Sequence, residues 1–276
     1  MGSGDQGINI APELDDISPR SLRRRGLRYG VLGRVLDYHA SVGSTNNQAR
    51  LLAGGGYPEG TVVLAEEQTS GRGRQGRAWH SPRGEGVFLS VILRPPVDAM
   101  EVARLTLVTG VAVVEAAQET TGIRLGLKWP NDLLYHGAKV GGILTENTGG
   151  GAVIVGIGIN TSQAEFPPEL AGKATSLYLA SGRRVDRAAL VVAVLQHLEA
   201  LYAAFLGGAL AGILDDWRRY SVTLGQRVRA VVNDEVVEGL AVDIDDHGAL
   251  LLEIEEEGAV RTQRLWAGEI TMLRPA

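Results

Sequence analysis

Residues Gly71–Trp79 read G-R-G-R-Q-G-R-A-W and lie between two apolar segments, Thr61–Ala65 and Val87–Leu93. Glycine lets backbone amides approach a ligand closely and adopt angles that other residues resist. Arginine adds a planar, permanently charged group that matches carboxylate and phosphate oxygens. Both flanking segments have the apolar pattern of buried strands. The sequence therefore predicts a strand, loop and strand unit whose loop stays mobile until it folds around an anion.

Two other interpretations of this loop stay open at this point. It has the composition of a solvated basic loop, and it also resembles an Arg-Gly segment that follows single-stranded nucleic acid. The chain has 276 residues and a net charge of -5, whereas a general nucleic-acid binder is usually basic overall. Aromatic residues near the arginines are limited to Trp79 and Phe88. Charge and composition thus favour a small anionic ligand.

Composition also excludes several kinds of site. The chain contains no cysteine, so disulfides, thiolate metal sites and enzyme thioesters are excluded. The five histidines lie far apart in sequence, so a histidine metal site is not expected and no metal ligand is placed. The sequence shows neither a secretory signal nor an uninterrupted apolar run typical of a membrane span. We expect a cytoplasmic protein with no membrane partner.

The middle of the chain alternates helix and strand patterns. A helix is expected to begin at Ser44-Thr45-Asn46, whose short side-chain oxygens can cap free amides, and to run to about Leu52. Helical spacing also marks Glu101–Glu119, an amphipathic Arg187–Phe205 and Ala209–Arg219. Short strands separated by tight turns are expected at Leu125–Trp129, Leu133–Tyr135, Lys139–Thr145 and Ala152–Ile159, and loop at Ser162–Thr175. This order predicts an antiparallel or mixed sheet.

The composition changes after Ser221, where short strands alternate with turns. Strands are expected at Val228–Val232, Glu235–Asp243, Ala249–Ile254 and Val260–Trp266, with turns between them that include Asn233-Asp234. We interpret this part as a small β-barrel. The sequence thus predicts a flexible leader over residues 1–28, a catalytic domain over 29–220 and a C-terminal barrel over 221–276.

Three further stretches carry chemically distinctive residues. Lys128–Asp132 reads K-W-P-N-D, Lys139–Leu144 reads K-V-G-G-I-L, and Gly156–Asn160 reads G-I-G-I-N. Glycines inside a strand often mark the close approach of a ligand or another backbone. Each stretch alone is more often structural than functional, and neither a Walker loop nor a Rossmann fingerprint is present.

Taken together and in this order, the four stretches resemble the signature of biotin protein ligases, from Gln68–Trp79 to Gly156–Asn160, with Ser44-Thr45-Asn46 matching a further motif. The resemblance covers about residues 30 to 270. It implies an α+β fold: a mixed β-sheet with helices on one face, similar to class II aminoacyl-tRNA synthetases, plus a C-terminal SH3-like β-barrel. It also implies an ATP- and Mg²⁺-dependent ligase that forms biotinyl-5'-AMP and transfers biotin to a lysine of a biotin carboxyl carrier protein, such as that of acetyl-CoA carboxylase.

The resemblance also implies roles for individual residues. Catalysis would fall to Lys139, Lys128 and Arg74. Biotin would contact Ser44, Thr45, Asn46, Gln68, Gly71, Arg72, Gly73, Arg74, Gly141, Gly142 and Gly158. ATP and the adenylate would contact Arg74, Arg77, Trp79, Asn131, Asp132, Lys139 and Asn160. Asp132 would hold either Lys128 or a metal-bound water.

Several alternatives and partners are left to test. A lipoate-type ligase would share the Lys139-type residue but should lack the complete G-R-G-R-x-G-R-x-W run. A non-catalytic biotin-binding or regulatory protein is a further alternative. Some members of the family carry a winged helix that represses genes; the polar stretch before Ser44 does not match one, so we expect no sequence-specific DNA binding. The resemblance leaves a homodimer open.

Overall fold

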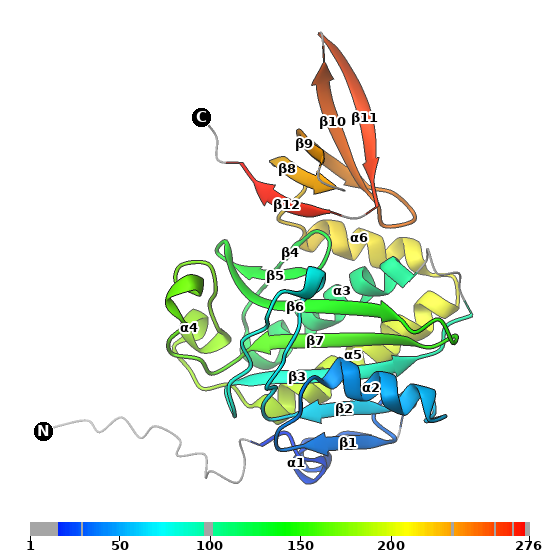
Figure 1. Ribbon diagram of the computed structural model, residues 1–276, viewed down its shortest axis with the longest axis vertical. Helices are drawn as coiled ribbons and strands as arrows, with labels where there is room; N and C mark the ends of the chain where they lie inside the picture. Colours follow the sequence, from blue (N-terminus) through cyan, green and yellow to red (C-terminus); the bar gives the residue numbers. More distant parts are fainter. Residues whose placement is uncertain are drawn as a thin grey trace, which may run out of the picture.

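Two β-sheets organise the chain (Figure 1), and the computed structural model describes residues 16–28, 30–96, 102–232, 235–256, 258–266 and 268–273. The first sheet contains β1 (Leu36–His39), β2 (Val62–Ala65), β3 (Gly86–Leu93), β4 (Gly126–Lys128), β5 (Asp132–Tyr135), β6 (Ala138–Asn147) and β7 (Val153–Asn160). The second contains β8 (Arg227–Val232), β9 (Glu235–Ile244), β10 (Leu250–Glu256), β11 (Ala259–Leu265) and β12 (Glu269–Met272). Residues 1–15 of the expected leader and the expected turn at 233–234 lie outside the described residues.

The first sheet is mixed, as the sequence predicts. Its strand order is β1-β2-β3-β7-β6-β5-β4, in which β1 and β2 are parallel and the other neighbours are antiparallel. All eight residues of β3 are buried, because helices or loops cover both faces of the sheet there. The central strands β3, β7 and β6 therefore form a rigid frame.

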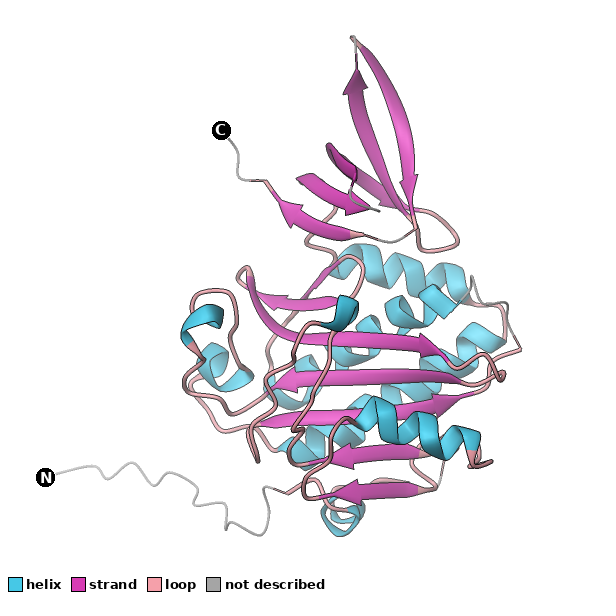
Figure 2. Ribbon diagram, viewed as in Figure 1, coloured by secondary structure: helices cyan, strands magenta, loops and turns pink. Residues whose placement is uncertain are grey.

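Helices lie on both faces of this sheet (Figure 2). The long helices α3 (Val102–Thr121) and α5 (Arg187–Leu206) cover one face, as expected. The shorter α2 (Thr45–Gly54) covers part of the other face, where Ala49 and Ala53 pack against Val63, Ile92 and Ile154. Period-two alternation along each strand sends neighbouring side chains to these two separate clusters.

Helix α5 is buried more completely than its expected amphipathic stripe implies. The consecutive residues Val191 to Leu195 are all buried, because the sheet, α3 and α1 (Pro19–Arg24) surround this part of the helix. Of the described helices, α5 is the one long and apolar enough to cross a membrane by length and composition alone. Its packing against α3 is that of a core helix.

The second sheet is antiparallel, in the order β11-β10-β9-β8-β12, and corresponds to the expected SH3-like barrel. Helix α6 (Leu210–Tyr220) lies between the two sheets (Figure 1). The sequence-based assignment missed β12, which pairs with β8 and brings Gly268 and Glu269 towards the first sheet.

The structure differs from the expected leader and contains a short helix that the sequence did not predict. Residues 16–28 contain α1, and Ile17 and Leu22 are fully buried in the core, so this part of the predicted flexible leader is packed. A further short helix, α4 (Leu177–Ser181), begins after the predicted loop, and Ser176 caps it by accepting from the Leu179 amide. Two apolar residues in an otherwise polar leader gave too weak a signal to predict α1.

Candidate active site

The floor of the candidate site is formed by glycines of β6 and β7. Gly142 and Gly158 are paired across the two strands, and Gly156 lies two residues before Gly158 on the same face. A methyl group on Gly158 would lie 2.7 Å from Trp79 Nε1, and one on Gly156 would collide with the Asn46 side-chain amide. The glycines are therefore required because side chains of the opposite wall lie directly on the strands.

The Gly-Arg loop forms a defined hairpin above this floor, although the sequence predicts a mobile loop before a ligand binds. Gly73 N donates to Arg77 O at 2.7 Å and Trp79 N donates to Gly71 O at 2.9 Å. The turn contains Gln75 and Gly76 at positive φ, a conformation that glycine adopts readily. The glycines thus shape the turn that aims the arginines.

The three arginines of the hairpin have different partners. Arg74 Nη1 donates to Asn131 Oδ1 and to the Gly268 carbonyl, each at 3.2 Å, and burial lowers the pKa of Arg74. Arg77 pairs with Glu269, and Arg72 donates to Asn47 Oδ1 on α2. Arg74 and Arg77 thus attach the hairpin to the start of β12, while Arg72 attaches it to α2.

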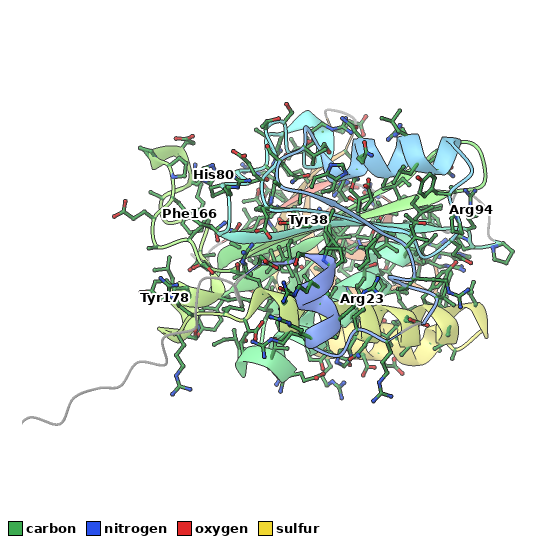
Figure 3. The ribbon with its side chains drawn as sticks, turned by 90° about the horizontal axis from the view of Figure 1, so that it is seen from below. Arg23, Tyr38, His80, Arg94, Phe166 and Tyr178 are labelled. Carbon is green, nitrogen blue, oxygen red and sulfur yellow. The ribbon has the colours of Figure 1, made fainter. Side chains whose placement is uncertain are left out.

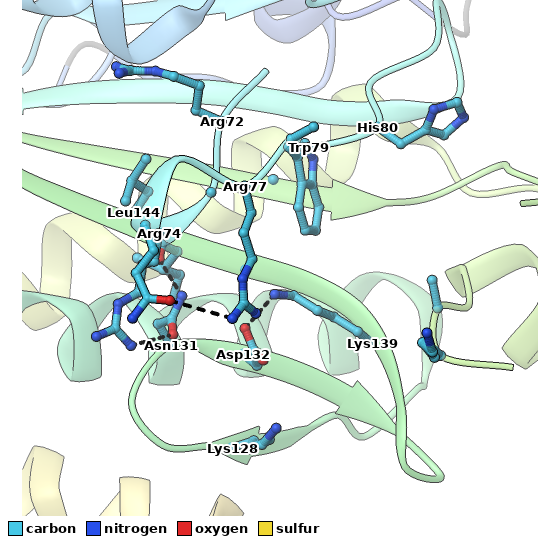
Figure 4. A pocket seen from close by; sticks show the side chains of 18 of the residues that line it. Arg72, Arg74, Arg77, Trp79, His80, Lys128, Asn131, Asp132, Lys139 and Leu144 are labelled. Carbon is cyan, nitrogen blue, oxygen red and sulfur yellow. Dashed lines mark hydrogen bonds and ion pairs between the residues drawn. The ribbon is translucent and has the colours of Figure 1, made fainter. Parts of the chain in front are cut away.

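Two lysines, Lys128 at the end of β4 and Lys139 near the start of β6, lie on either side of Asp132 (Figure 4). Lys139 Nζ lies 2.5 Å from Asp132 Oδ1 and 5.3 Å from the centre of the Trp79 ring. Burial lowers the pKa of Lys128; the Asp132 carboxylate opposes that shift and the Lys139 ammonium adds to it. Asp132 therefore forms its ion pair with Lys139. Its interaction with Lys128, which the sequence suggested as a direct contact, is electrostatic.

A buried hydrogen-bond network lies at the opposite end of the glycine floor. Gln68 Oε1 accepts from the Thr45 amide at 2.9 Å and from the Thr45 hydroxyl at 3.1 Å. Ser90 Oγ lies 2.6 Å from Asn46 Oδ1, which can only accept, so the Ser90 hydroxyl donates there. The first turn of α2 is thus capped by Gln68, whereas Ser44 makes no capping hydrogen bond.

These groups surround a cavity of about 890 Å³. Most of the predicted site residues line it: Ser44, Thr45, Asn46, Gln68, Arg72, Gly73, Arg74, Arg77, Trp79, Lys128, Asn131, Asp132, Lys139, Gly142, Gly158 and Asn160. Gly71 and Gly141 do not; a methyl group on either would lie 2.7–2.8 Å from a backbone carbonyl oxygen, so both allow close backbone packing.

Sequence reasoning missed two parts of the wall. One is the segment from Phe166 to Ala174, which pairs with Lys139: Lys139 N donates to Lys173 O at 2.8 Å. The other is the stretch from Gly268 to Met272, including β12. Neither has a distinctive motif, and the second reaches the cavity only because the C-terminal sheet folds against the first.

The carboxylates of the cavity bear on metal binding. Asp132 and Glu269 are the acidic residues that line it, and each is already paired with a cation. Within the described residues, no group of three or more His, Cys, Asp or Glu side chains is arranged to hold a metal ion. Mg²⁺ commonly binds through one or two carboxylates plus substrate phosphates. The lining thus fits a metal held mainly by the phosphate oxygens of a ligand rather than one held by the protein alone.

Trp79 offers a further polar contact. Its indole Nε1 is buried and has no hydrogen-bond partner among the described residues. Because an unpaired buried donor is costly, this N–H is suited to a ligand oxygen above Gly158. The cavity therefore combines a cationic junction, an indole wall and a polar network.

Comparison with known families identifies the class of protein. Residues 39–161 match the "Biotin/lipoate A/B protein ligase family", and residues 223–273 match the "Biotin protein ligase C terminal domain". The chain is 37% identical to the biotin–[acetyl-CoA-carboxylase] ligase of Mycobacterium tuberculosis, over 96% of this chain and 98% of that protein. The chain belongs to the biotin protein ligase family, and it is a ligase.

Two other relatives define the extent of the similarity. The bifunctional ligase/repressor BirA of Bacillus subtilis is 42% identical, over 84% of this chain and 74% of that protein. The solved biotin protein ligase from Aquifex aeolicus in complex with biotin and ATP superposes with a TM-score of 0.78 at 31% identity, covering 88% of this chain and 100% of that chain.

Proposed function

We propose that this protein activates biotin with ATP to form biotinyl-5'-AMP and then transfers biotin to a lysine of a biotin carboxyl carrier protein. The observation that carries the proposal is the meeting of four separate stretches in one cavity, where Arg74, Lys128 and Lys139 all interact with Asp132. The family and the Aquifex aeolicus structure with biotin and ATP supply the ligand classes.

The closed end of the cavity supports the ring end of biotin. There, Thr45, Asn46 and Gln68 present amide and hydroxyl groups to the cavity, and hydrogen bonds among them and to the buried Ser90 behind them fix their orientations. A ring carrying a ureido group offers both donors and acceptors, which such a preorganised network can satisfy. The apolar tail would then lie along Gly142 and Gly158, below Trp79.

The cationic junction supports the first chemical step. A carboxylate must approach the α-phosphate of ATP, and two like unit charges 4 Å apart repel by roughly 4 kcal/mol near a protein surface. Arg74, Lys128 and Lys139 offset this repulsion and the charge that develops in the transition state. Mg²⁺ bound with ATP would neutralise further phosphate charge. The carboxylate oxygen attacks the α-phosphorus, and pyrophosphate leaves.

The second step transfers the acyl group. The amine of the carrier lysine attacks the acyl carbon, an amide bond forms, and AMP leaves. The lowered pKa of Lys128 makes this lysine, in its neutral form, the candidate to receive the proton that the attacking amine loses. Water would hydrolyse the mixed anhydride, so the hairpin of residues 71–79 must exclude it between the two steps.

Substitution at the junction tests the proposal. Lys139→Ala and Arg74→Ala should each slow pyrophosphate release from biotin and ATP by a factor of about one hundred or more, the range for removal of one transition-state contact. Arg34→Ala, an exposed arginine away from the cavity, is the matched control and should leave the rate unchanged. Near-normal release in both junction variants would remove these residues from the mechanism.

Lipoate is the competing substrate, because the matched family includes lipoate ligases. The C-terminal domain match and the relatives named as biotin ligases favour biotin. Incubation with labelled biotin or lipoate and a carrier domain separates the two. The absence of sequence-specific DNA binding stays a prediction of the sequence, which a gel shift with a biotin operator tests.

A further inference from the structure

A buried ion pair lies behind the ligand hairpin, outside the residues that line the cavity. Glu66 Oε2 and Arg187 Nη1 are 2.7 Å apart, and their side chains are only 8% and 3% exposed. Burying two charges costs desolvation energy that the pair itself only partly returns. Arg187 is also the first residue of α5, where the helix dipole disfavours a cation. Stability of the helix therefore does not explain this pair.

The pair connects the two ends of the ligand loop. Glu66 directly follows β2, Gly86 begins β3, and residues 67–85 between them include the Gly-Arg hairpin. Arg187 Nη1 donates to the Gly86 carbonyl at 3.2 Å as well as to Glu66, while Gly84 N donates to Glu66 O at 3.1 Å. One guanidinium group thus fixes both ends of the loop.

The N-terminal segment Asp16–Arg25 completes this arrangement. The Ile17 amide donates to Glu66 Oε1 at 2.9 Å, and Arg25 forms a 2.6 Å ion pair with Asp186, the N-cap of α5. Tyr38, which lies beside α1 in Figure 3, donates its hydroxyl to the same Glu66 oxygen at 3.3 Å. Burial together with the Glu66 charge raises the pKa of Tyr38 to about 12, so its hydroxyl remains a donor at neutral pH.

From this geometry we propose that Glu66 and Arg187 are positioning residues that hold the ligand loop closed over the activated intermediate, and that the segment Asp16–Arg25 is the third component of this brace. The inference rests on the proposed function, because it assigns the brace to retention of biotinyl-5'-AMP. Neither residue touches the cavity; both act through the ends of the loop that carries Gln68, Arg74 and Trp79.

We expect the brace to affect how long biotinyl-5'-AMP stays bound more than how fast it forms. Lys128 and Lys139 sit on β4 and β6 and keep their positions when the loop ends loosen. Arg74 lies in the hairpin itself, and its contacts with Asn131 and the Gly268 carbonyl return it to the junction each time the hairpin closes. The hairpin then opens more often, and the adenylate escapes to water before a carrier arrives. Loosening should therefore let the enzyme consume ATP without a carrier, while the first turnover stays fast.

The test measures pyrophosphate release by the full-length protein with biotin and ATP but no carrier. Wild type should give a stoichiometric burst and then a slow steady phase, since retained adenylate blocks the next turnover. Glu66→Gln and Arg187→Met should keep the burst and accelerate the steady phase by roughly ten- to hundredfold, the range for loss of a buried charged hydrogen bond. Arg187→Lys, which keeps the charge, should lie between them and wild type.

A matched control separates retention from stability. Glu59 also accepts two hydrogen bonds with one oxygen, from Arg94 N and the Tyr202 hydroxyl, each at 2.7 Å, but it contacts no part of the ligand loop. Glu59→Gln should lower the melting temperature and leave the steady phase at the wild-type rate. If Arg187→Met does not fold, Glu66→Gln alone tests the proposal. It should fold, because glutamine has the same shape as glutamate and keeps an oxygen that accepts from the Ile17 amide.

Two negative outcomes are distinguishable. A wild-type steady phase in folded Glu66→Gln and Arg187→Met, or an equal acceleration in Glu59→Gln, overturns the brace and leaves the proposed function intact. A wild-type protein that releases no pyrophosphate with biotin and ATP overturns the proposed function itself.

Discussion

Single glycines set the distance between the floor of the cavity and its ligands. At Gly158, a methyl group would lie 2.7 Å from Trp79 Nε1, closer than such atoms approach in folded proteins. The indole would have to move, and the slot that it borders would change shape. The spacing between these glycines and Trp79 arises from tertiary contacts, so neither the composition nor the length of the strand predicts it.

Gly158→Ala should weaken biotin binding by roughly tenfold or more, because displacing a packed side chain costs about 1–3 kcal/mol. Titration of Trp fluorescence or calorimetry measures the affinity. Gly212→Ala in α6 is the matched control: nothing lies within 4 Å of the added methyl group, and alanine favours a helix. Equal biotin affinity in both variants would contradict the assignment of Gly158 to the tail slot.

The lowered pKa of Lys128 predicts the pH dependence of transfer. A lysine can accept a proton only in its neutral form, which becomes populated as pH rises through its pKa. Single-turnover transfer from preformed biotinyl-5'-AMP should therefore begin to rise at a pH below the ordinary lysine value of 10.5. The attacking carrier lysine must also be neutral, so its own titration persists in Lys128→Arg, but that variant should lose the Lys128 component and shift the rise to higher pH. An unchanged profile in that variant would exclude Lys128 as the proton acceptor.

Strand β12 and the ligand hairpin meet through Arg77 and Glu269. The hydrogen bond from Arg77 holds the pKa of Glu269 below its ordinary value of 4.5. A carboxylate whose folded pKa is depressed contributes its interaction above the ordinary pKa and loses it as pH falls through the folded value. The contact is thus complete at neutral pH and weakens only below about pH 4.5.

Glu269→Gln should mimic the acid form at neutral pH and weaken one of the two contacts between the hairpin and the start of β12, while the Arg74 contact with Gly268 remains. It should raise KM for ATP with little change in biotin affinity. Steady-state kinetics at pH 7 measure both quantities. Glu238→Gln, which removes an exposed pair with Arg229 in the same sheet, is the control. A variant with unchanged KM for ATP would show that the Arg77 contact does not hold the nucleotide side of the loop.

Elements with long, regular patterns could be predicted from the sequence, and elements defined by tertiary contacts could not. Strand β3 follows from a continuous apolar run, and helices α3 and α5 follow from the helical spacing of their apolar residues. Helix α1 depends on Ile17 and Leu22 finding a buried site, and β12 on pairing with β8. The N-terminus of α2 could not be predicted fully for the same reason. Ser44 occupies the N-cap position, but the side-chain oxygen that accepts from the Thr45 amide belongs to Gln68, 23 residues further along the chain.

At the scale of the whole molecule, the two sheets are interlocked and the cavity depends on both. Trp129 is buried, with its amide donating to Thr223 Oγ1 at 2.9 Å and its indole to the Gly248 carbonyl at 3.0 Å. Arg218 of α6 bonds Asp243 and the Ile244 carbonyl in the second sheet. Four motifs in the sequence were enough to indicate the family. The contribution of β12 to the cavity could not be predicted, because it depends on how the second sheet packs against the first.

The most direct test of the account is mass spectrometry of a biotin carboxyl carrier domain after incubation with this protein, biotin, ATP and Mg²⁺. The account predicts that one lysine of the carrier gains one biotinyl group, and that omission of either biotin or ATP abolishes the gain. A carrier that stays unmodified, while an established biotin ligase labels it under the same conditions, would contradict the account, as would a lipoyl group in place of biotin.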